Sequence, residues 1–249
     1  MTSQVELYQA LTLVAAVAVF DSLERRRPGF PVNRRHDLSL NILAIAIVIV
    51  VGELWKPLIT QGLSAAGLNL NVFPAAIHRM PGALKILLGI ILTDLSLYWV
   101  HRAMHGNALL WRTHAFHHTI GQIWWLAGSR TSATHLFLFA VPQIIIGRYV
   151  LALSSFETGI AYSFAVVVNL WVHTNIWVDL GPLEWLIITP NYHRIHHGAK
   201  GLGNKNLAFV FTVWDRMFGT YVDPRVLGKN FAVFAVSSKK SLPRIIAGF

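Results

Sequence analysis

Residues 84–105 read LKILLGIILTDLSLYWVHRAMH, an apolar run that ends in a pair of histidines. The part from Leu84 to about Val100 is close to the roughly 20 residues with which a helix crosses the hydrocarbon of a bilayer. His101 and His105 follow at a spacing that places both imidazoles on one face of a continuing helix. This stretch therefore predicts a membrane helix that carries two metal-ligand side chains at its end.

Further apolar runs lie on both sides of this segment. We expect a first span at about residues 5–22, a second at Leu38–Ile59, and later stretches at Leu136–Leu153 and Ile160–Trp177. Apolar residues make up 54% of the chain and charged residues only 13%, which is typical of a protein that lives in a bilayer. The sequence predicts an all-α integral membrane protein with a single membrane domain over residues 1–249. We expect about four to five transmembrane or membrane-embedded helices and a cytoplasmic, histidine-rich helical cap.

The basic residues predict which end faces the cytoplasm, because short cytoplasmic loops collect lysine and arginine. If the arginine-rich loop 25–35 is cytoplasmic, residues 101–134 and 174–249 are cytoplasmic as well. Only four of the 21 lysines and arginines then fall on the opposite side, namely Lys56, Arg79, Lys85 and Arg148. The net charge of +10 fits attraction to an anionic membrane surface, and no nucleic-acid-binding motif accompanies it.

Two more histidine clusters follow the pair at 101 and 105. They are His114, His117 and His118, and then His193, His196 and His197. Helical spacing points the imidazoles of each cluster at a common spot, which argues against solvent-facing histidines without a metal. Eight such ligands exceed the needs of one ion, so we expect two metal ions. The chain has no cysteine and no carboxylate within the clusters, and a sphere of imidazoles suits iron, zinc or copper.

Three residues outside the clusters are candidates for the same site. Asp94 shares a helical stripe with His101 and His105, where it would either orient a metal-bound imidazole or form a structural hydrogen bond between spans. His173, near the end of the last apolar stretch, is predicted to reach the depth of His101 and to be a ninth ligand rather than a structural histidine. For His135, ligand and structural roles stay open.

Other polar and aromatic residues near the clusters fit the membrane surface. Trp124 and Trp125 are expected in an interfacial aromatic belt or in the wall of a substrate channel. Arg130 and Lys200 are predicted to belong to a solvated basic rim rather than to contact a lipid headgroup. The loop histidines predicted to be surface residues are His36 and His78.

Several motifs identify a family resemblance when they are taken together. The histidine motifs are HRAMH at 101–105, HAFHH at 114–118 and NYHRIHH at 191–197, and they are accompanied by DLSLYWVHR at 94–102, GPLEWL at 181–186 and WDRMFGTY at 214–221. The set resembles the histidine boxes and flanking segments of the fatty acid hydroxylase/sterol desaturase superfamily of integral membrane di-iron enzymes. The resemblance covers roughly residues 84–222, which implies a catalytic region there and N-terminal spans in residues 1–83.

The resemblance also implies roles for individual residues. It carries the ligand role over to the eight clustered histidines and, more loosely, to His173, and it implies catalytic roles for Asp94 and Asn191. Some family members have a further histidine where this chain has Asn169, and many have His-Pro-x-Glu where this chain reads His135-Leu-Phe-Leu. His135 and Asn169 are therefore kept as possible additional ligands.

The activity implied by the resemblance is that of a hydroxylase (monooxygenase) or desaturase with two iron ions and dioxygen as co-substrate. It would attack an unactivated C–H bond of a membrane lipid, such as a sterol, a fatty acyl chain, an ether lipid or a carotenoid. Zinc binds the same ligands and could replace iron on purification. No flavin, haem or iron–sulfur motif is present, so a separate reductase is expected to donate electrons.

Two other classes of function are alternatives for a protein with these histidines. A membrane metal transporter would normally place its ionisable residues at the bilayer midplane, whereas these histidines gather at one predicted face. A structural protein that holds zinc through the same histidines is the other alternative.

Overall fold

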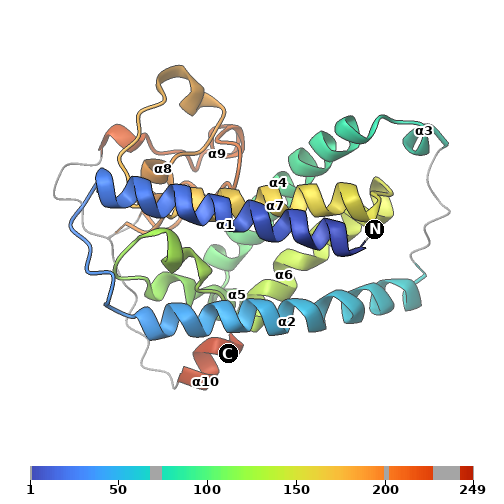
Figure 1. The fold of residues 1–249 in the computed structure, drawn as a ribbon, viewed down its shortest axis with the longest axis horizontal. Helices are drawn as coiled ribbons and strands as arrows, with labels where there is room; N and C mark the ends of the chain where they lie inside the picture. The colour runs from blue at the N-terminus through green and yellow to red at the C-terminus, as the bar shows by residue number, and fades with distance from the viewer. Residues whose placement is uncertain (1, 68–74, 199–201, 227–241, 249) are drawn as a thin grey trace.

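The computed structural model describes residues 2–67, 75–198, 202–226 and 242–248, which form a bundle of long helices with short helical segments gathered at one end (Figure 1). Within these described ranges, five helical segments are long and apolar enough to cross a membrane. They are α1 (Thr2–Arg26), α2 (Leu38–Ala65), α4 (Gly82–Gly106), the segment Ala133–Val150 and α7 (Ser155–Val172). The prediction of an all-α membrane protein with a histidine-rich cap is confirmed.

The described chain also contains several short helices. They are α3 (Ala75–His78), α5 (Ala108–His114), η2 (His117–Thr119), η3 (Trp125–Ser129), η5 (Gly181–Trp185), α8 (Pro190–His196), α9 (Val213–Met217), η6 (Pro224–Val226) and α10 (Leu242–Ala247). An isolated antiparallel bridge joins Ile187 and Phe211.

The last two apolar stretches begin and end a few residues earlier than the sequence suggested. The fourth segment consists of α6 (Ala133–Ile144) and a π-helical turn, Ile145–Val150. The fifth, α7, ends at Val172 instead of Trp177. Serine N-caps set the two starts: the Ser132 hydroxyl accepts the His135 N–H, and Ser154 forms a capping box with the acid three residues later.

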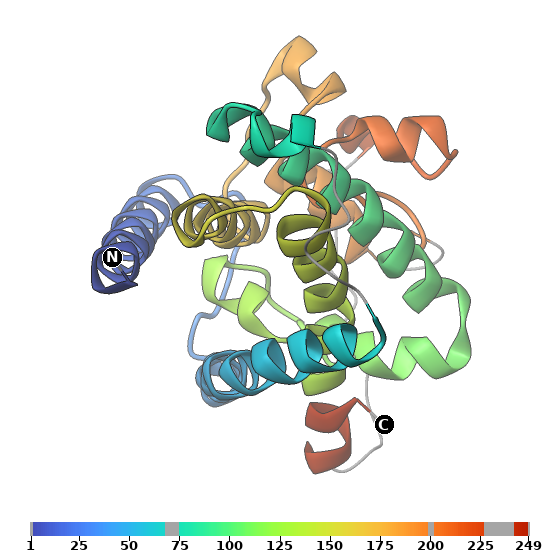
Figure 2. The same cartoon turned by 90° about the vertical axis from the view of Figure 1, so that its right-hand side faces the viewer.

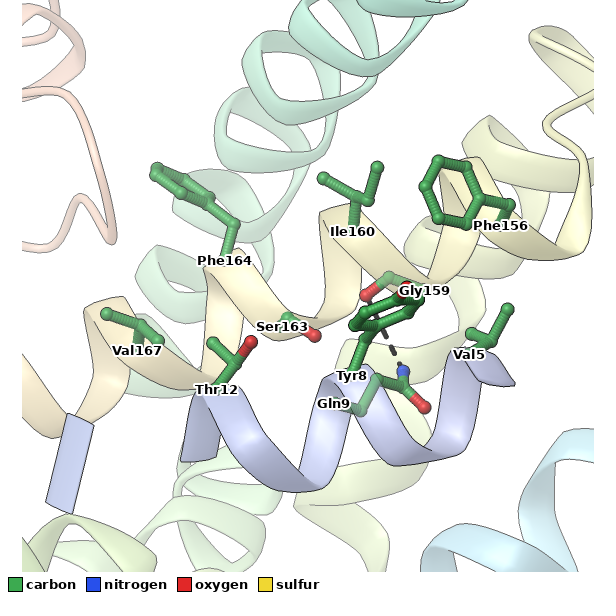
Figure 3. Close-up of a pocket in the computed structure, with 10 residues that line it drawn as sticks. All are labelled: Val5, Tyr8, Gln9, Thr12, Phe156, Gly159, Ile160, Ser163, Phe164 and Val167. Atoms are coloured by element: carbon green, nitrogen blue, oxygen red, sulfur yellow. Dashed lines mark hydrogen bonds between the residues drawn. The ribbon is translucent and has the colours of Figure 1, made fainter. Parts of the chain in front are cut away.

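The long helices pack so that the sequence-distant α1 and α7 lie side by side, as do α2 and α6 (Figures 1 and 2). Gly159 lets α1 approach α7 closely, because a Cβ there would lie only 2.5 Å from a methyl carbon of Val5. Gln9 donates a hydrogen bond to the Gly159 carbonyl at 3.5 Å, beside an open, mostly apolar groove between the two helices (Figure 3). This contact joins the N-terminal helix to the later part of the bundle.

All five long segments bring one terminus to the same end of the bundle. The ends of α1, α4 and α7 and the starts of α2 and α6 meet there, next to α5 and α8 (Figure 1). Capping fixes where the two short helices begin: Asn107 accepts the N–H groups of Leu109 and Leu110, and Thr189 accepts the Tyr192 N–H. The second and third histidine motifs are therefore positioned by short helices whose starts are fixed at this end of the bundle.

Candidate metal centre

The structure gathers nine of the predicted ligands into two groups of imidazoles. The first group is His101 and His105 of α4, His114 of α5, His118 of η2 and His196 of α8. The second group is His117 of η2, His173 after α7, His193 of α8, and His197 at the end of α8. Within each group one ring nitrogen from every residue lies within 4.8 Å of the others.

Nε2 atoms form the inner face of the first group. His114 Nε2 lies 2.9 Å from His101 Nε2 and 3.1 Å from His118 Nε2. His118 Nε2 is in turn 3.0 Å from His196 Nε2. Adjacent ligands at right angles around one ion, with metal–nitrogen bonds of about 2.1 Å, would be roughly 3 Å apart. The spacing therefore fits a shared metal ion, and five imidazoles leave one position of an octahedron for another ligand.

The second group has the same construction with four imidazoles. His173 Nε2 lies 3.4 Å from His117 Nε2 and 3.0 Å from His193 Nε2. His197 Nε2 is 3.2 Å from His193 Nε2. All four residues are buried. The position of His173 agrees with its predicted role as the ninth ligand.

The two groups are neighbours because consecutive residues contribute to different groups. His118 of η2 and His196 of α8 belong to the first group, whereas their chain neighbours His117 and His197 belong to the second group. The rings of His118 and His197, one from each group, have centroids 4.8 Å apart. The HH pairs of the second and third motifs thus place the two groups of converging imidazoles side by side in one buried centre.

Backbone carbonyls orient the outer nitrogens of four of these rings. The Nδ1–carbonyl distances are 2.7 Å for His101 to Leu207, 3.0 Å for His117 to Arg130, 2.8 Å for His173 to Asn169 and 3.1 Å for His196 to Lys205. A carbonyl can only accept, so Nδ1 carries the proton and Nε2 keeps its lone pair. This tautomer presents a ligand atom to the centre and matches the outer partners that metal-bound histidines usually have.

Burial keeps the imidazoles of the cap neutral. It lowers the pKa of His173 to about 4. For the remaining cap ligands, burial and the neighbouring imidazoles hold the pKa well below its usual value; these are His114, His117, His118, His193, His196 and His197. Neutral imidazole is the form that binds a metal.

The carboxylate of Asp94 binds backbone and indole N–H groups instead of an imidazole. Its carboxylate accepts hydrogen bonds from the N–H groups of Phe209 (3.1 Å), Val210 (2.9 Å) and Phe211 (2.8 Å), and from the Trp214 indole at 2.9 Å. Asp94 therefore ties α4 to the segment that follows the third histidine motif. This is the structural hydrogen bonding between elements that the sequence left open, and the catalytic role that the resemblance implies for Asp94 stays a prediction.

Asp215 is a second buried carboxylate that holds the same segment, and its role was missed from the sequence. It accepts the N–H groups of Leu207 and Ala208, each at 2.8 Å, and the hydroxyl of Tyr192. The Leu207 carbonyl is the partner of His101 Nδ1. The two aspartates thus fix the backbone that orients a ligand. The sequence feature that could have indicated Asp215 is its place among the aromatic residues of the WDRMFGTY motif.

The possible additional ligands lie beside the groups. His135 is buried, and its Nδ1 is 3.2 Å from Nδ1 of His114, on the side of that ring away from the centre. The Asn169 amide donates to the Gly128 carbonyl, while its own backbone carbonyl supports His173. Neither residue belongs to the two groups of converging nitrogens.

Asn191 is buried at the start of α8. Its side-chain N–H donates to the Val178 carbonyl, and its Oδ1 has no hydrogen-bond partner among the described residues. This contact anchors the third motif to the segment that follows α7. The catalytic role expected of Asn191 stays a prediction.

Two surface predictions were wrong. Arg130 is buried rather than part of a basic rim: it pairs with Asp37 at 2.9 Å and donates to the Asn41 side chain at 2.7 Å. Trp124 is also buried, packed in an apolar cluster, so it is not part of an exposed belt. Trp125 donates from its indole to Asp21, and the alternative that the two residues line a substrate channel stays a prediction. His36 is exposed as expected, whereas the side chain of His78 and residue Lys200 lie outside the described part of the chain.

Glu24 of α1 connects the N-terminal helix to the second group, a role that was not predicted from the sequence. Its buried carboxylate pairs with Arg34 at 2.6 Å and accepts the N–H of Asn175 at 2.8 Å. The Asn175 side chain accepts a hydrogen bond from Arg194, the residue that follows His193. An acidic side chain at the end of an apolar stretch indicates that the residue needs a partner inside the protein. The sequence does not show which one, because the backbone N–H that Glu24 accepts lies 151 residues away.

Comparison with known proteins agrees with this geometry. The family model described as fatty acid hydroxylase matches residues 86–220, which is more than half of the chain. An ornithine lipid hydroxylase of Rhizobium tropici is 27% identical over 225 residues, covering 86% of this chain and 66% of that protein. An alkylglycerol monooxygenase of Danio rerio is 34% identical over 129 residues, covering 51% of this chain and 28% of that protein.

A more distant relative extends over most of the chain. Human lathosterol oxidase is 25% identical over 226 residues, covering 88% of this chain and 71% of that protein. No solved structure matches the chain. The matched region of the family model contains all three histidine motifs and His173. The chain belongs to the fatty acid hydroxylase family.

Proposed function

We propose that this protein is an integral membrane hydroxylase that uses two iron ions and dioxygen to oxidise a C–H bond of a lipid. The observation that carries the proposal is the convergence of nine imidazoles in two adjacent groups at the end of five apolar helices. Redox-active metal ions with imidazole ligands supply dioxygen chemistry when bound. The named activities of the relatives, hydroxylase, monooxygenase and oxidase, support this class of reaction.

The residues around the centre have three tasks in the proposed reaction. The imidazoles hold the ions through Nε2, the backbone carbonyls fix the rings, and the surrounding burial keeps bulk water from the centre. Hydroxylation of a C–H bond places one oxygen atom of dioxygen in the product and reduces the other to water. This balance requires two electrons and two protons, so we propose that a separate reductase delivers the electrons.

The proposed substrate is a membrane lipid that reaches the centre from the bilayer. The centre lies where the apolar helices end, so an apolar chain can approach it without crossing bulk water (Figure 1). The relatives are named for an ornithine lipid, an alkylglycerol and lathosterol. Within this class, hydroxylation is favoured over desaturation by the names of the first two relatives.

We also propose that the metal centre faces the cytoplasm. The arginine-rich loop after α1 lies at the same end of the bundle as the histidines, because the N–H of Gly29 donates to the Asn175 carbonyl at 2.8 Å. Cytoplasmic loops collect basic residues. This orientation would give a soluble or membrane-bound reductase access to the centre.

The alternative functions receive less support from the geometry. A transporter requires exchangeable ligands along a path through the membrane, whereas eight of the nine imidazoles are buried at one end of the bundle. A structural zinc site is usually filled by four ligands, whereas the first group offers five. An open coordination position is the property that a catalytic site needs.

Lipid analysis of cells with and without the protein tests the proposed function. We expect a lipid species with one additional oxygen atom in the expressing cells, and its loss when dioxygen is withheld. A lipid profile that is the same in both cells, with the protein present in the membrane and loaded with iron, would contradict the proposal.

A further inference from the structure

Four large apolar side chains point outward from the cap, away from the metal centre. Leu183 and Trp185 of η5, the following Leu186, and Met217 of α9 have exposed fractions of 58%, 69%, 51% and 64%. We call these four residues the apolar patch. Exposed apolar groups that gather in this way mark an interaction surface more often than single exposed residues do.

The backbone under the apolar patch is firmly held, so the exposure is a property of the fold. The hydroxyl of Thr212 donates to the carbonyls of Glu184 (3.0 Å) and Trp185 (2.7 Å), and its N–H donates to the Leu186 carbonyl at 3.0 Å. The acidic side chain in η5, Glu184, turns back and accepts the Leu180 N–H. The outer surface of η5 is therefore left to leucine and tryptophan.

Contacts connect the apolar patch to the outer surface of a membrane helix. Trp99 of α4 is 47% exposed, and its ring centroid lies 4.8 Å from that of Phe218, the neighbour of Met217. On the other side of Met217, the Arg216 guanidinium lies 3.9 Å from the centroid of the Trp185 ring. The apolar patch thus continues the lipid-facing surface of α4 across α9 to η5.

The direction of η5 places this surface along the membrane plane. η5 projects sideways from the bundle, roughly across the axes of α1 and α2 (Figure 1), and in the second view it lies outside the ring of long helices (Figure 2). Arg102 lies over the Trp99 ring at 5.4 Å, and Arg216 lies over Trp185. Tryptophan with nearby arginine is the composition of segments at the membrane–water interface.

We propose that the apolar patch is inserted into the headgroup–acyl boundary of the bilayer and anchors the cap to the membrane surface. The chain runs directly from the patch through Ile187 and Ile188 to Thr189, which caps α8. Insertion therefore fixes the depth of the third histidine motif relative to the lipids. This anchoring is independent of the reaction that the centre performs.

Depth-dependent fluorescence quenching tests the anchor. Because the chain has no cysteine, the single-cysteine variant Leu183→Cys can be labelled with an environment-sensitive fluorophore and reconstituted in vesicles of phosphatidylcholine and phosphatidylglycerol. Arg225→Cys is the matched control, because Arg225 is also an exposed cap residue but pairs with Asp223 instead of lying in the patch. The quenchers are a nitroxide-labelled acyl lipid and aqueous iodide.

We expect blue-shifted emission from Leu183→Cys and lipid quenching several-fold stronger than in the control, with iodide quenching correspondingly weaker. Met217→Cys, on a different helix of the patch, should behave like Leu183→Cys, which guards against a local effect of one substitution. Iodide quenching of both variants as strong as in Arg225→Cys would overturn the proposal. Protection from both quenchers would also overturn it, and disulfide formation between two Leu183→Cys chains would then assign the surface to a second copy.

Discussion

The variant His196→Ala is expected to abolish lipid oxidation while the protein still accumulates in the membrane. His196 contributes an Nε2 atom 3.0 Å from that of His118 in the first group. Loss of an outer partner of a metal ligand typically costs about 10- to 100-fold in affinity or activity, so removal of a ligand should cost at least about 100-fold. The measurement is the amount of oxidised lipid per amount of protein in expressing cells.

His36→Ala is the matched control for this variant, because His36 is an exposed histidine outside both groups. It should leave the amount of oxidised lipid unchanged. If His196→Ala gives the wild-type lipid profile while complete removal of the protein alters it, the histidine groups do not carry the activity. A scaffold or carrier role would then replace the proposed one.

The second large effect concerns metal content. The wild-type protein is expected to hold about two metal ions per chain, and His197→Ala is expected to reduce the content to about one. His197 belongs to the second group only, so its removal leaves three imidazoles there and the first group intact. Metal analysis after gentle detergent extraction measures the content, and zinc counts as well as iron because the same ligands bind both.

Asn169→Ala distinguishes a ligand from a neighbour in this experiment. The backbone carbonyl of Asn169, which the substitution keeps, supports His173, whereas its side chain donates to the Gly128 carbonyl. Both ions should therefore remain in this variant. Loss of one ion from Asn169→Ala, or a content of one in the wild type that His197→Ala does not change, would contradict the assignment of the two groups.

Local patterns predicted the membrane helices and most of the centre. Apolar runs located all five long segments, since hydrocarbon thickness sets a minimum length that a sequence shows directly. Helical spacing identified the pair His101 and His105 on α4, and the depth of the last span identified His173. The second motif is different, because α5 ends at His114 and the next two ligands lie in a separate 3₁₀ turn. Its three rings are distributed over both groups by a turn of the chain, so they do not share one helix face.

The residues that were misplaced or missed depend on contacts between distant parts of the chain. Arg130 looked like a surface cation, but α2 supplies Asn41 and a neighbouring aspartate to pair with it inside the protein. Glu24 binds a backbone N–H beyond α7, and Asp94 binds backbone N–H groups beyond α8. A backbone partner carries no side-chain signature, so no spacing rule reveals it. The sequence indicates that such buried charges need partners, while the fold determines which partners they find.

Incorporation of isotope-labelled dioxygen is the most direct test of a dioxygen-dependent lipid hydroxylase. Membranes that contain the iron-loaded protein, a reductant and the unoxidised precursor of the lipid product identified in cells would be exposed to heavy-oxygen dioxygen in ordinary water. A parallel sample would be exposed to ordinary dioxygen in heavy-oxygen water. We predict one heavy oxygen atom in each product molecule from the first sample and none in the second, with neither product formed by His196→Ala. Oxygen that comes from water, or product that forms equally well without dioxygen, would contradict the proposed function.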